Sequence, residues 1–301
     1  MESLFERYCE IIPEYSAFLE SLKQPLPVHL RVNRLKIEPA LLASLLEKKG
    51  IQLTRVSERD EGLLLAQGSF SVGNLLEYYL GYFHPQALTS CLVSLAFPVR
   101  PDSLVLDMCA SPGGKTSHLA QLMNNTGLII ANEPYPRRQI PLAHTLGRLG
   151  VLNTVLTTYQ AQEFPLRTRF DYVLADVPCS GEGRFRTEGK APWYGRARGK
   201  GALPDLQKKI IIRGFDLLKE GGEMVYATCT YNPDENEAVV DFLLRNREAK
   251  LLPVEFGLPI QPGLSEWRKE PYDRQLRRAA RFYPHQVNSV GFFMARIGRR
   301  L

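Results

Sequence analysis

The pattern of hydrophobic and polar positions changes at about residue 100. From Asp102 onward, short continuous apolar runs alternate with segments in which apolar residues recur at helical spacing. The runs predict buried strands at 104–107, 128–133, 154–159, 171–176 and 223–227. Helical spacing predicts helices at 115–123, after the second strand up to residue 148, at 205–218 and at 235–245. Apolar strands with helices between them are typical of a parallel sheet covered on both faces, which defines an α/β fold.

The region before residue 100 has shorter elements of mixed type. We expect helical structure at 4–22, interrupted at Pro13, because proline lacks the amide hydrogen that a helix interior needs. The pattern further predicts strands at 29–33, 52–56 and 62–65 and helices at 39–49 and 87–97. It divides the chain into a small α/β domain at 1–80 and a larger domain at 81–301. We expect Gly221–Gly222 to end the helix at 205–218. Near the C-terminus we expect 287–296 to form a strand or hairpin.

Composition adds a bias in charge. Of the 301 residues 44% are hydrophobic, which suffices for a full core, and the formal net charge is +6. An excess of Lys and Arg favours a polyanionic partner, because bound phosphates release counterions. A basic enzyme without such a partner has the same composition, so charge alone does not decide.

Cysteine usage points to a reducing compartment. There are five cysteines and no CxxC pair, which argues against a disulfide framework and against a zinc site. No apolar run is long enough to span a membrane. We therefore expect a cytoplasmic protein with no metal, in which any important cysteine acts as a thiol.

The first candidate site residues follow the strand at 104–107. Residues 107–116 form a glycine-rich turn that leads into a helix, where small residues admit a ligand to the backbone and free N–H groups face it. Gly114-Lys115-Thr116 matches the end of a phosphate-binding P-loop. That motif requires glycine where Cys109 stands, and no GxGxxG is present, so a nucleotide hydrolase and a dinucleotide enzyme are poor alternatives.

Three more strand ends carry polar residues or thiols. Glu133 ends the second strand, where a carboxylate commonly accepts hydrogen bonds from ribose hydroxyls, although a surface carboxylate would look the same. Asp176-Val177-Pro178-Cys179 ends another strand, with cysteine where amine methyltransferases carry an aromatic residue. Thr228-Cys229-Thr230 ends the last. A lone cysteine in an apolar strand is usually core filling, but two at the ends of central strands suggest chemistry.

These stretches closely resemble the Sun (Fmu) family of RNA cytosine-C5 methyltransferases. The resemblance rests on Asp-x-Pro-Cys-Ser-Gly-Glu-Gly from Asp176, on Thr-Cys-Thr with Glu235-Asn236-Glu237, on residues 281–293 and on Leu30-Arg31-Val32-Asn33. It implies a Rossmann-like methyltransferase domain behind a smaller RRM-like, RNA-binding N-terminal domain. Ser111 stands where the family usually has alanine, and Gln160 where it has a cofactor-binding aspartate.

The resemblance also implies a cofactor and roles for individual residues. The cofactor is S-adenosylmethionine, and the residues expected to bind it are Cys109, Ala110, Ser111, Pro112, Gly113, Gly114, Lys115, Glu133, Gln160, Asp176 and Pro178. Cys229 is expected to be the nucleophile, Cys179 to release the product and Asp176 to contact N3 of the base.

The chemistry explains why such a site needs thiols. Carbon 5 of cytosine is a weak nucleophile, and a thiolate added at carbon 6 converts the base into an enamine that accepts the methyl group. A carboxyl group near N3 can share a proton with the charged adduct. Spacing alone does not decide which cysteine attacks, since DNA cytosine methyltransferases carry their nucleophile after a proline, as Cys179 is here.

RNA is the expected partner. The residues expected to contact it are Arg31, Asn33, Arg184, Arg186, Lys190, Arg281 and His285, and basic residues interleaved with aromatics at 184–200 and 267–281 favour phosphate contact with base stacking. Ordinary solvated loops remain the alternative for any single residue. Ribosomal RNA is favoured over transfer RNA, because 133–150 looks most like the ribosomal branch. An amino-group or DNA cytosine methyltransferase and a non-catalytic RNA-binding assembly factor are the alternatives, and a monomer is expected.

Overall fold

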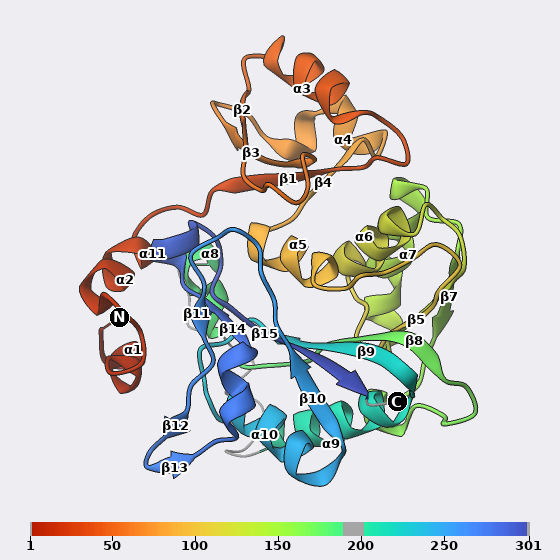
Figure 1. Cartoon of the computed structure of the whole chain (residues 1–301). Coiled ribbons are helices and arrows are strands. Elements are labelled where there is room, and N and C mark those ends of the chain that lie inside the picture. Colours follow the sequence, from red (N-terminus) through yellow and green to blue (C-terminus); the bar gives the residue numbers. More distant parts are fainter. Residues whose placement is uncertain (1, 189–201, 300–301) are drawn as a thin grey trace.

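The computed structural model describes residues 2–188 and 202–299, and its larger unit is built on a nine-stranded sheet (Figure 1). Five neighbouring strands are parallel: β5 (Leu104–Asp107), β6 (Leu128–Asn132), β7 (Thr154–Thr157), β8 (Phe170–Asp176) and β9 (Leu218–Thr228). Their order is β9-β8-β5-β6-β7. The predicted strands all exist, and the α/β class is confirmed.

The other side of the sheet is antiparallel, which the sequence did not predict. β15 (Phe292–Arg299) pairs with β9 in the antiparallel sense, and it is followed outward by β14 (Ala280–Phe282) and β11 (Gln261–Pro262), while β10 (Ala249–Leu252) pairs with the far part of β15. Only residues 283–291 join β14 to β15, and a parallel pair needs a longer crossover. The sheet is therefore mixed.

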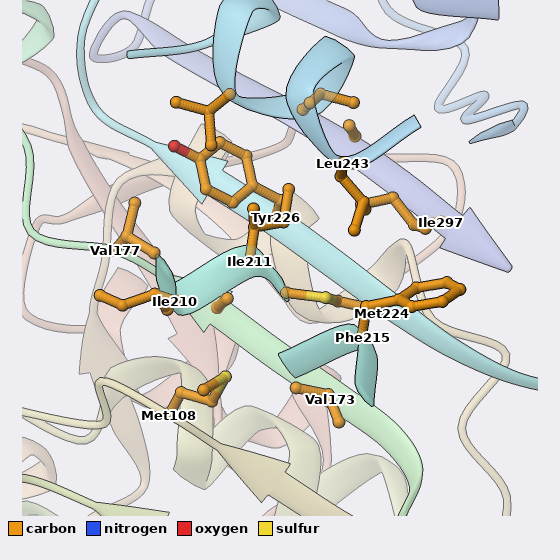
Figure 2. Packing of buried hydrophobic residues seen from close by; sticks show 14 of the residues in the cluster. Met108, Val173, Val177, Ile210, Ile211, Phe215, Met224, Tyr226, Leu243 and Ile297 are labelled. Carbon is orange, nitrogen blue, oxygen red and sulfur yellow. The ribbon is translucent and has the colours of Figure 1, made fainter. Parts of the chain in front are cut away.

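Helices cover both faces of this sheet. The helices are α5 (Leu88–Leu95), α6 (Gly114–Leu122), α7 (Pro136–Leu149), α9 (Ala202–Asp216) and α10 (Glu237–Asn246). Val173 and Met224 pack under α9 and α10, as Figure 2 shows with Ile211 and Leu243. Their strand neighbours, such as Leu174, face α5 and α6 on the other side, as the two-residue period of a strand requires.

The predicted end of one helix was wrong. Helix α9 stops at Asp216, and Gly221–Gly222 lie within β9. Phe170 N donates to Leu217 O (2.8 Å), so the chain already joins the sheet before the two glycines. An irregularity in the β8–β9 register accommodates them.

The smaller unit is a four-stranded antiparallel sheet with two helices. It comprises β1 (Val28–Val32), α3 (Pro39–Glu47), β2 (Gln52–Arg55), β3 (Leu63–Gln67), α4 (Leu76–Tyr79) and β4 (Phe83–Pro85). The strand order β2-β3-β1-β4 and the βαββαβ succession are those of a ferredoxin-like fold, to which RRM domains belong. β4 lies beyond residue 80, outside the small domain that the sequence pattern predicted at 1–80.

The N-terminal segment, residues 2–22, packs away from this small sheet. It contains α1 (Glu2–Phe5), a 3₁₀ turn at Glu6–Tyr8 and α2 (Tyr15–Leu22), so the break around Pro13 is confirmed. In Figure 1 it lies beside α8 (Phe185–Glu188) and α11 (Pro284–Val287) of the larger unit. Its aromatic residues pack against Phe185, Tyr231 and Tyr283 there.

The remaining elements are short. They are 3₁₀ turns at Val72–Asn74, Ala161–Glu163, Glu182–Arg184 and Arg274–Arg278, and the hairpin of β12 (Glu266–Trp267) and β13 (Glu270–Pro271). Within the described residues, no helix is both long and apolar enough to cross a membrane.

Candidate active site

Three adjacent strands end at one edge of the large sheet and bring the predicted residues together. β5 leads into the glycine-rich loop, and β8 and β9 lead into the two cysteine loops. Asp176 at the end of β8 is paired with Ala227, two residues before Cys229. Carboxyl ends of parallel strands are where α/β sheets bind ligands. The sequence therefore predicted correctly which segments meet.

The two cysteines of these loops face each other. Cys179 Sγ and Cys229 Sγ are 3.3 Å apart, close enough for one sulfur to donate a hydrogen bond to the other. Cys179 is buried, whereas Cys229 is partly exposed. The other three thiols, including exposed Cys9, are free as well.

The surroundings shift the pKa values of the two thiols in opposite directions. A hydrogen bond from Cys179 lowers the pKa of Cys229, and nearby Lys115 and Arg184 act in the same direction against burial and Asp176. The pKa of Cys179 is raised well above its ordinary value by the same hydrogen bond and by burial. Of the two thiols, Cys229 therefore ionises first, and its thiolate accepts a hydrogen bond from the Cys179 thiol.

Lys115 and Asp176 form an ion pair beside the thiols. Lys115 Nζ donates to Asp176 Oδ2 at 2.7 Å. Burial by itself lowers the pKa of Lys115, but the Asp176 carboxylate outweighs burial and raises it. The ammonium also lies 5.5 Å from the centre of the Phe292 ring. The Lys115 ammonium and the Asp176 carboxylate thus lie beside the loops that carry the two cysteines.

The glycine-rich loop is fixed by its own side chains. Thr116 Oγ1 donates to buried Asp107 at 2.7 Å, and burial raises the pKa of Asp107 to about 6. Gly113 has φ +102°, and a Cβ added there would come within 3.1 Å of Leu142 Cδ1. Ser111 and Pro112 are joined by a cis peptide bond, and Ser111 Oγ donates to Arg138 O (2.9 Å). The loop leads directly into the N-terminus of α6, whose first N–H groups have no partner within the helix.

Glu133 is a buried carboxylate at the end of β6. Only 2% of its surface is exposed; Tyr135 N donates to it at 3.1 Å, and Arg138 forms an ion pair with it at 3.3 Å. Gln160 differs, because it is exposed, beyond β7 at the start of the turn at Ala161–Glu163. Pro178 O accepts a hydrogen bond from Gln207 (2.9 Å), which orients the loop before Cys179.

Asn132 is a site residue that sequence reasoning missed. Its Nδ2 donates to Met108 O (3.1 Å) and Tyr159 O (2.8 Å), and its Oδ1 accepts from Tyr159 N (2.9 Å). It ties the glycine-rich loop to the segment that carries Gln160. The sequence signal that could have indicated it is a polar amide inside a run of apolar strand residues, because such an amide, once buried, needs hydrogen-bond partners.

Two glutamates, which the sequence analysis named only as part of the family motifs, also hold the cysteine loops through hydrogen bonds. Glu235 accepts hydrogen bonds from Ser180 N (2.9 Å) and Asn232 Nδ2 (3.1 Å), which links the loops after β8 and β9. Glu182 is buried and accepts from Thr230 Oγ1 at 3.0 Å.

Three of the predicted RNA contacts are buried inside the protein, where their side chains bind other parts of the chain. Arg31 is 1% exposed and donates to Gln121 Oε1 (2.8 Å) and Ser117 Oγ (2.8 Å) of α6. Asn33 donates to Gly81 O (2.8 Å) and to Leu149 O (2.7 Å). Arg31 and Asn33 therefore join the small sheet to the large unit. The polar residues of the motif at 30–33 belong to the interface between these two units.

Arg281 is the third. It is 2% exposed and forms a two-pronged ion pair with Glu237, at 2.6 and 2.5 Å. Its guanidinium also donates to Tyr231 O (3.1 Å), directly after the Cys229 loop.

The other predicted RNA contacts have mixed positions. Arg186 is partly exposed, but its guanidinium donates to Gln24 O (3.2 Å), Pro25 O (3.0 Å) and Asn288 Oδ1 (2.9 Å). His285 is partly buried between Phe18 and Tyr283, whereas Arg184 is exposed. Lys190 lies outside the described residues.

Comparison with known proteins identifies the family. Residues 94–298 match the family described as 16S rRNA methyltransferase RsmB/F, and residues 3–72 match the ferredoxin-like domain of RsmF/B-like methyltransferases. The chain is 36% identical over 303 residues to a mouse 28S rRNA (cytosine-C(5))-methyltransferase, of which it covers 38%. It thus spans well under half the length of that relative.

Two archaeal proteins match over nearly their full length. A tRNA (cytosine(49)-C(5))-methyltransferase of Pyrococcus abyssi is 35% identical, and the match covers 98% of this chain and 95% of the relative. The crystal structure of a methyltransferase homologue from Pyrococcus horikoshii superimposes with a TM-score of 0.86 at 33% identity, over 99% of this chain and 95% of that one. The strand-end loops, the paired cysteines and these matches together show that the chain belongs to the RsmB/F family of methyltransferases.

Proposed function

We propose that this chain is an S-adenosylmethionine-dependent RNA cytosine-C5 methyltransferase. The single observation that carries the proposal is the pair of sulfurs 3.3 Å apart at the ends of β8 and β9, in which Cys229 is the more acidic and more exposed thiol. Two thiols serve this reaction, because one must attack carbon 6 and the other can assist the later loss of the carbon 5 proton. An amine methyltransferase has no use for either.

Cys229 is the nucleophile in this proposal. Its thiolate needs no separate base, since the Cys179 thiol and the Lys115 ammonium already stabilise it. The raised pKa of Cys179 lets Cys229 ionise first, so Cys179 does not compete for carbon 6 of the cytosine. Once Cys229 is bonded to carbon 6, its sulfur no longer accepts the Cys179 proton. Cys179 can then release that proton to solvent and take the proton from carbon 5. Spacing left this order open, and the geometry supports Cys229.

Asp176 faces the Watson–Crick edge of the cytosine. Its carboxylate is partly exposed and lies at the end of β8, between the glycine-rich loop and the thiols. Paired with Lys115, it can share a proton with N3 as the adduct forms. The cytosine must leave its stack to reach these groups, which favours an unpaired or distorted substrate region.

The cofactor site is the glycine-rich loop together with Glu133. The N-terminus of α6 has no side-chain cap, so its first N–H groups are available to a ligand, and buried Glu133 has carboxylate oxygens suited to two ribose hydroxyls. S-adenosylmethionine supplies the electrophilic methyl group. The proposed cofactor contacts Cys109 to Lys115 belong to this loop, whereas Gln160 is exposed and lies beyond β7.

Ribosomal RNA is the proposed substrate. The mouse relative acts on 28S rRNA and the matched family is named for 16S rRNA, while the Pyrococcus abyssi relative, which acts on tRNA, supports transfer RNA as the second candidate. We propose a cytoplasmic monomer that uses no metal; within residues 2–188 and 202–299 no group of three His, Cys, Asp or Glu side chains could hold one.

The test uses purified wild type, Cys229→Ala and Cys179→Ala with labelled S-adenosylmethionine and separate ribosomal and transfer RNA fractions. We expect label at carbon 5 of cytosine with wild type, no turnover with Cys229→Ala, and protein trapped on RNA with Cys179→Ala. The labelled fraction identifies the substrate. Normal turnover by Cys229→Ala would contradict the mechanism, and cofactor binding without labelling of any RNA would favour an assembly factor.

A further inference from the structure

The loop that carries Cys229 is tied to the loop that carries Cys179 through one buried carboxylate. Glu182 lies three residues after Cys179 and is 5% exposed. Its Oε2 accepts a hydrogen bond from Thr230 Oγ1 at 3.0 Å, and Thr230 directly follows Cys229. Gly183 N also donates to Cys229 O at 2.9 Å. Glu182 and Gly183 therefore bind the residue after Cys229 and the backbone carbonyl of Cys229 itself.

The hydrogen bonds around Thr230 have one consistent direction. A hydroxyl carries a single proton, and Thr230 Oγ1 lies 2.7 Å from Ser180 Oγ as well as 3.0 Å from the Glu182 carboxylate. Burial raises the pKa of Glu182, while Arg7, Tyr8 and Thr230 act against burial and favour the carboxylate. A carboxylate paired with Arg7 only accepts hydrogen bonds, so Thr230 donates to Glu182, and Ser180 donates to Thr230. The direction ends on Glu182, which makes this carboxylate the anchor of both loops.

The N-terminal segment holds Glu182 from the opposite side. Tyr8 Oη donates to Glu182 Oε2 at 2.9 Å, and Arg7 forms a short ion pair with Oε1. Burial, reinforced by the neighbouring carboxylate, raises the pKa of Tyr8, so the phenol stays protonated and remains a donor. Tyr8 is fully buried, with Tyr231 and Trp267 as ring neighbours. Residues some 170 positions away thus fix the carboxylate between the cysteine loops.

We propose that Glu182, held by Arg7 and Tyr8, is a positioning residue that keeps Cys229 Sγ within hydrogen-bond distance of Cys179 Sγ. This inference rests on the proposed function, because it concerns the same pair of thiols. The Cys229 thiolate depends on a short contact with Cys179, and a hydrogen bond weakens steeply once the partners separate. The N-terminal segment is then part of the catalytic machinery, although it contributes no group that touches the reacting atoms.

The experiment measures the reactivity of Cys229 directly. Full-length protein is alkylated with iodoacetamide from about pH 6 to about pH 10, a range that spans thiol titration, and the Cys229 peptide is quantified by mass spectrometry. The variants are Tyr8→Phe, which keeps the ring, and Thr230→Val, which keeps the shape. Thr230→Ser restores the hydroxyl. Glu77→Gln is the matched control, since Glu77 is a buried carboxylate paired with Lys49 (2.7 Å) in the small domain.

We expect Tyr8→Phe and Thr230→Val to slow alkylation near neutral pH by about three- to tenfold, the range allowed by one lost hydrogen bond, and to move its midpoint to higher pH. Thr230→Ser is expected to restore the wild-type profile, and Glu77→Gln to leave it unchanged even if it lowers the melting temperature. A wild-type profile in both Tyr8→Phe and Thr230→Val would overturn the proposal, as would an equal shift in Glu77→Gln.

Alkylation needs neither RNA nor cofactor. If Cys229→Ala still methylates RNA, the proposed mechanism fails, and a shifted alkylation profile in Tyr8→Phe still supports the positioning of the thiols by Glu182. If methylation follows the proposed mechanism but the profile does not shift, only the positioning role is overturned. The two failures are therefore distinguishable.

Discussion

Cys229 and Cys179 are both free thiols at strand ends, and their surroundings shift their pKa values in opposite directions. Cys229 accepts the hydrogen bond and lies near Lys115 and Arg184, while Cys179 donates and is buried. The resulting thiolate is the reactive species, so reactivity follows the titration of Cys229.

The pH dependence of Cys229 alkylation tests this arrangement. The fraction of thiolate rises with pH and levels off above the pKa, so a lowered pKa moves the midpoint below that of an unperturbed cysteine. We expect Cys179→Ala to move the midpoint upward, because it removes the hydrogen-bond donor. Cys9→Ala, a change at an exposed cysteine, is the control; a midpoint unaffected by Cys179→Ala would contradict the assigned hydrogen bond.

Glu133 and Gln160 give a second contrast between single residues. Glu133 is a buried carboxylate beside the glycine-rich loop, and Gln160 is exposed at its margin. We expect Glu133→Ala to weaken S-adenosylmethionine binding by about tenfold or more, since it removes hydrogen bonds to a charged acceptor, and Gln160→Ala to have a smaller effect. Isothermal calorimetry measures both, and equal effects would show that Gln160 contacts the cofactor as the resemblance implies.

At the scale of elements, the buried ion pair between Arg281 and Glu237 joins β14 to the start of α10. Arg281 also donates to Tyr231 O, so the pair supports the segment after the Cys229 loop. Removing one partner leaves an uncompensated charge in the interior.

We expect Arg281→Met to lower the free energy of unfolding by about 3–5 kcal/mol, as is typical when one partner of a buried pair is removed. Urea denaturation measures the change, and Arg281→Met combined with Glu237→Leu is expected to recover much of it. The exposed pair of Arg247 and Asp216 is the control, with an expected loss below about 1 kcal/mol. If Arg281→Met left the free energy of unfolding nearly unchanged but weakened RNA binding, Arg281 would contact RNA as the sequence predicted.

At the scale of the whole molecule, the ferredoxin-like unit is joined to the large unit by buried polar contacts. Arg31 and Asn33 reach from the small sheet to α6 and to the end of α7. We propose that the boundary between the two units falls after Pro85, because β4 completes the small sheet, and that residues 2–22 belong structurally with the larger unit.

The net charge of +6 leads to a prediction about RNA binding by the whole chain. We expect the logarithm of RNA affinity to fall linearly with the logarithm of salt concentration, because phosphate contacts release counterions. Arg184→Gln, at an exposed position, is expected to reduce the slope by about 1. Arg31→Gln, at a buried one, is expected to leave the slope unchanged. A flat salt response of the wild type would contradict phosphate-driven binding.

The sequence by itself determined the α/β class, the parallel strands and the loops that meet at their ends. These features depend on local apolar runs, turn residues and motif letters, which a sequence displays directly. The residues of the candidate site at Asp176, Cys179, Cys229 and Glu133 could be named for the same reason.

Only the tertiary structure decided which charged side chains are buried, which strands run antiparallel and which cysteine is the more acidic. Arg31 and Arg281 read as solvent-facing cations, yet each is buried with partners from distant segments. The acidity of Cys229 likewise depends on Cys179, Lys115 and Arg184, which only folding brings near it. Such properties arise from contacts between residues far apart in the chain, and no local pattern encodes those distances.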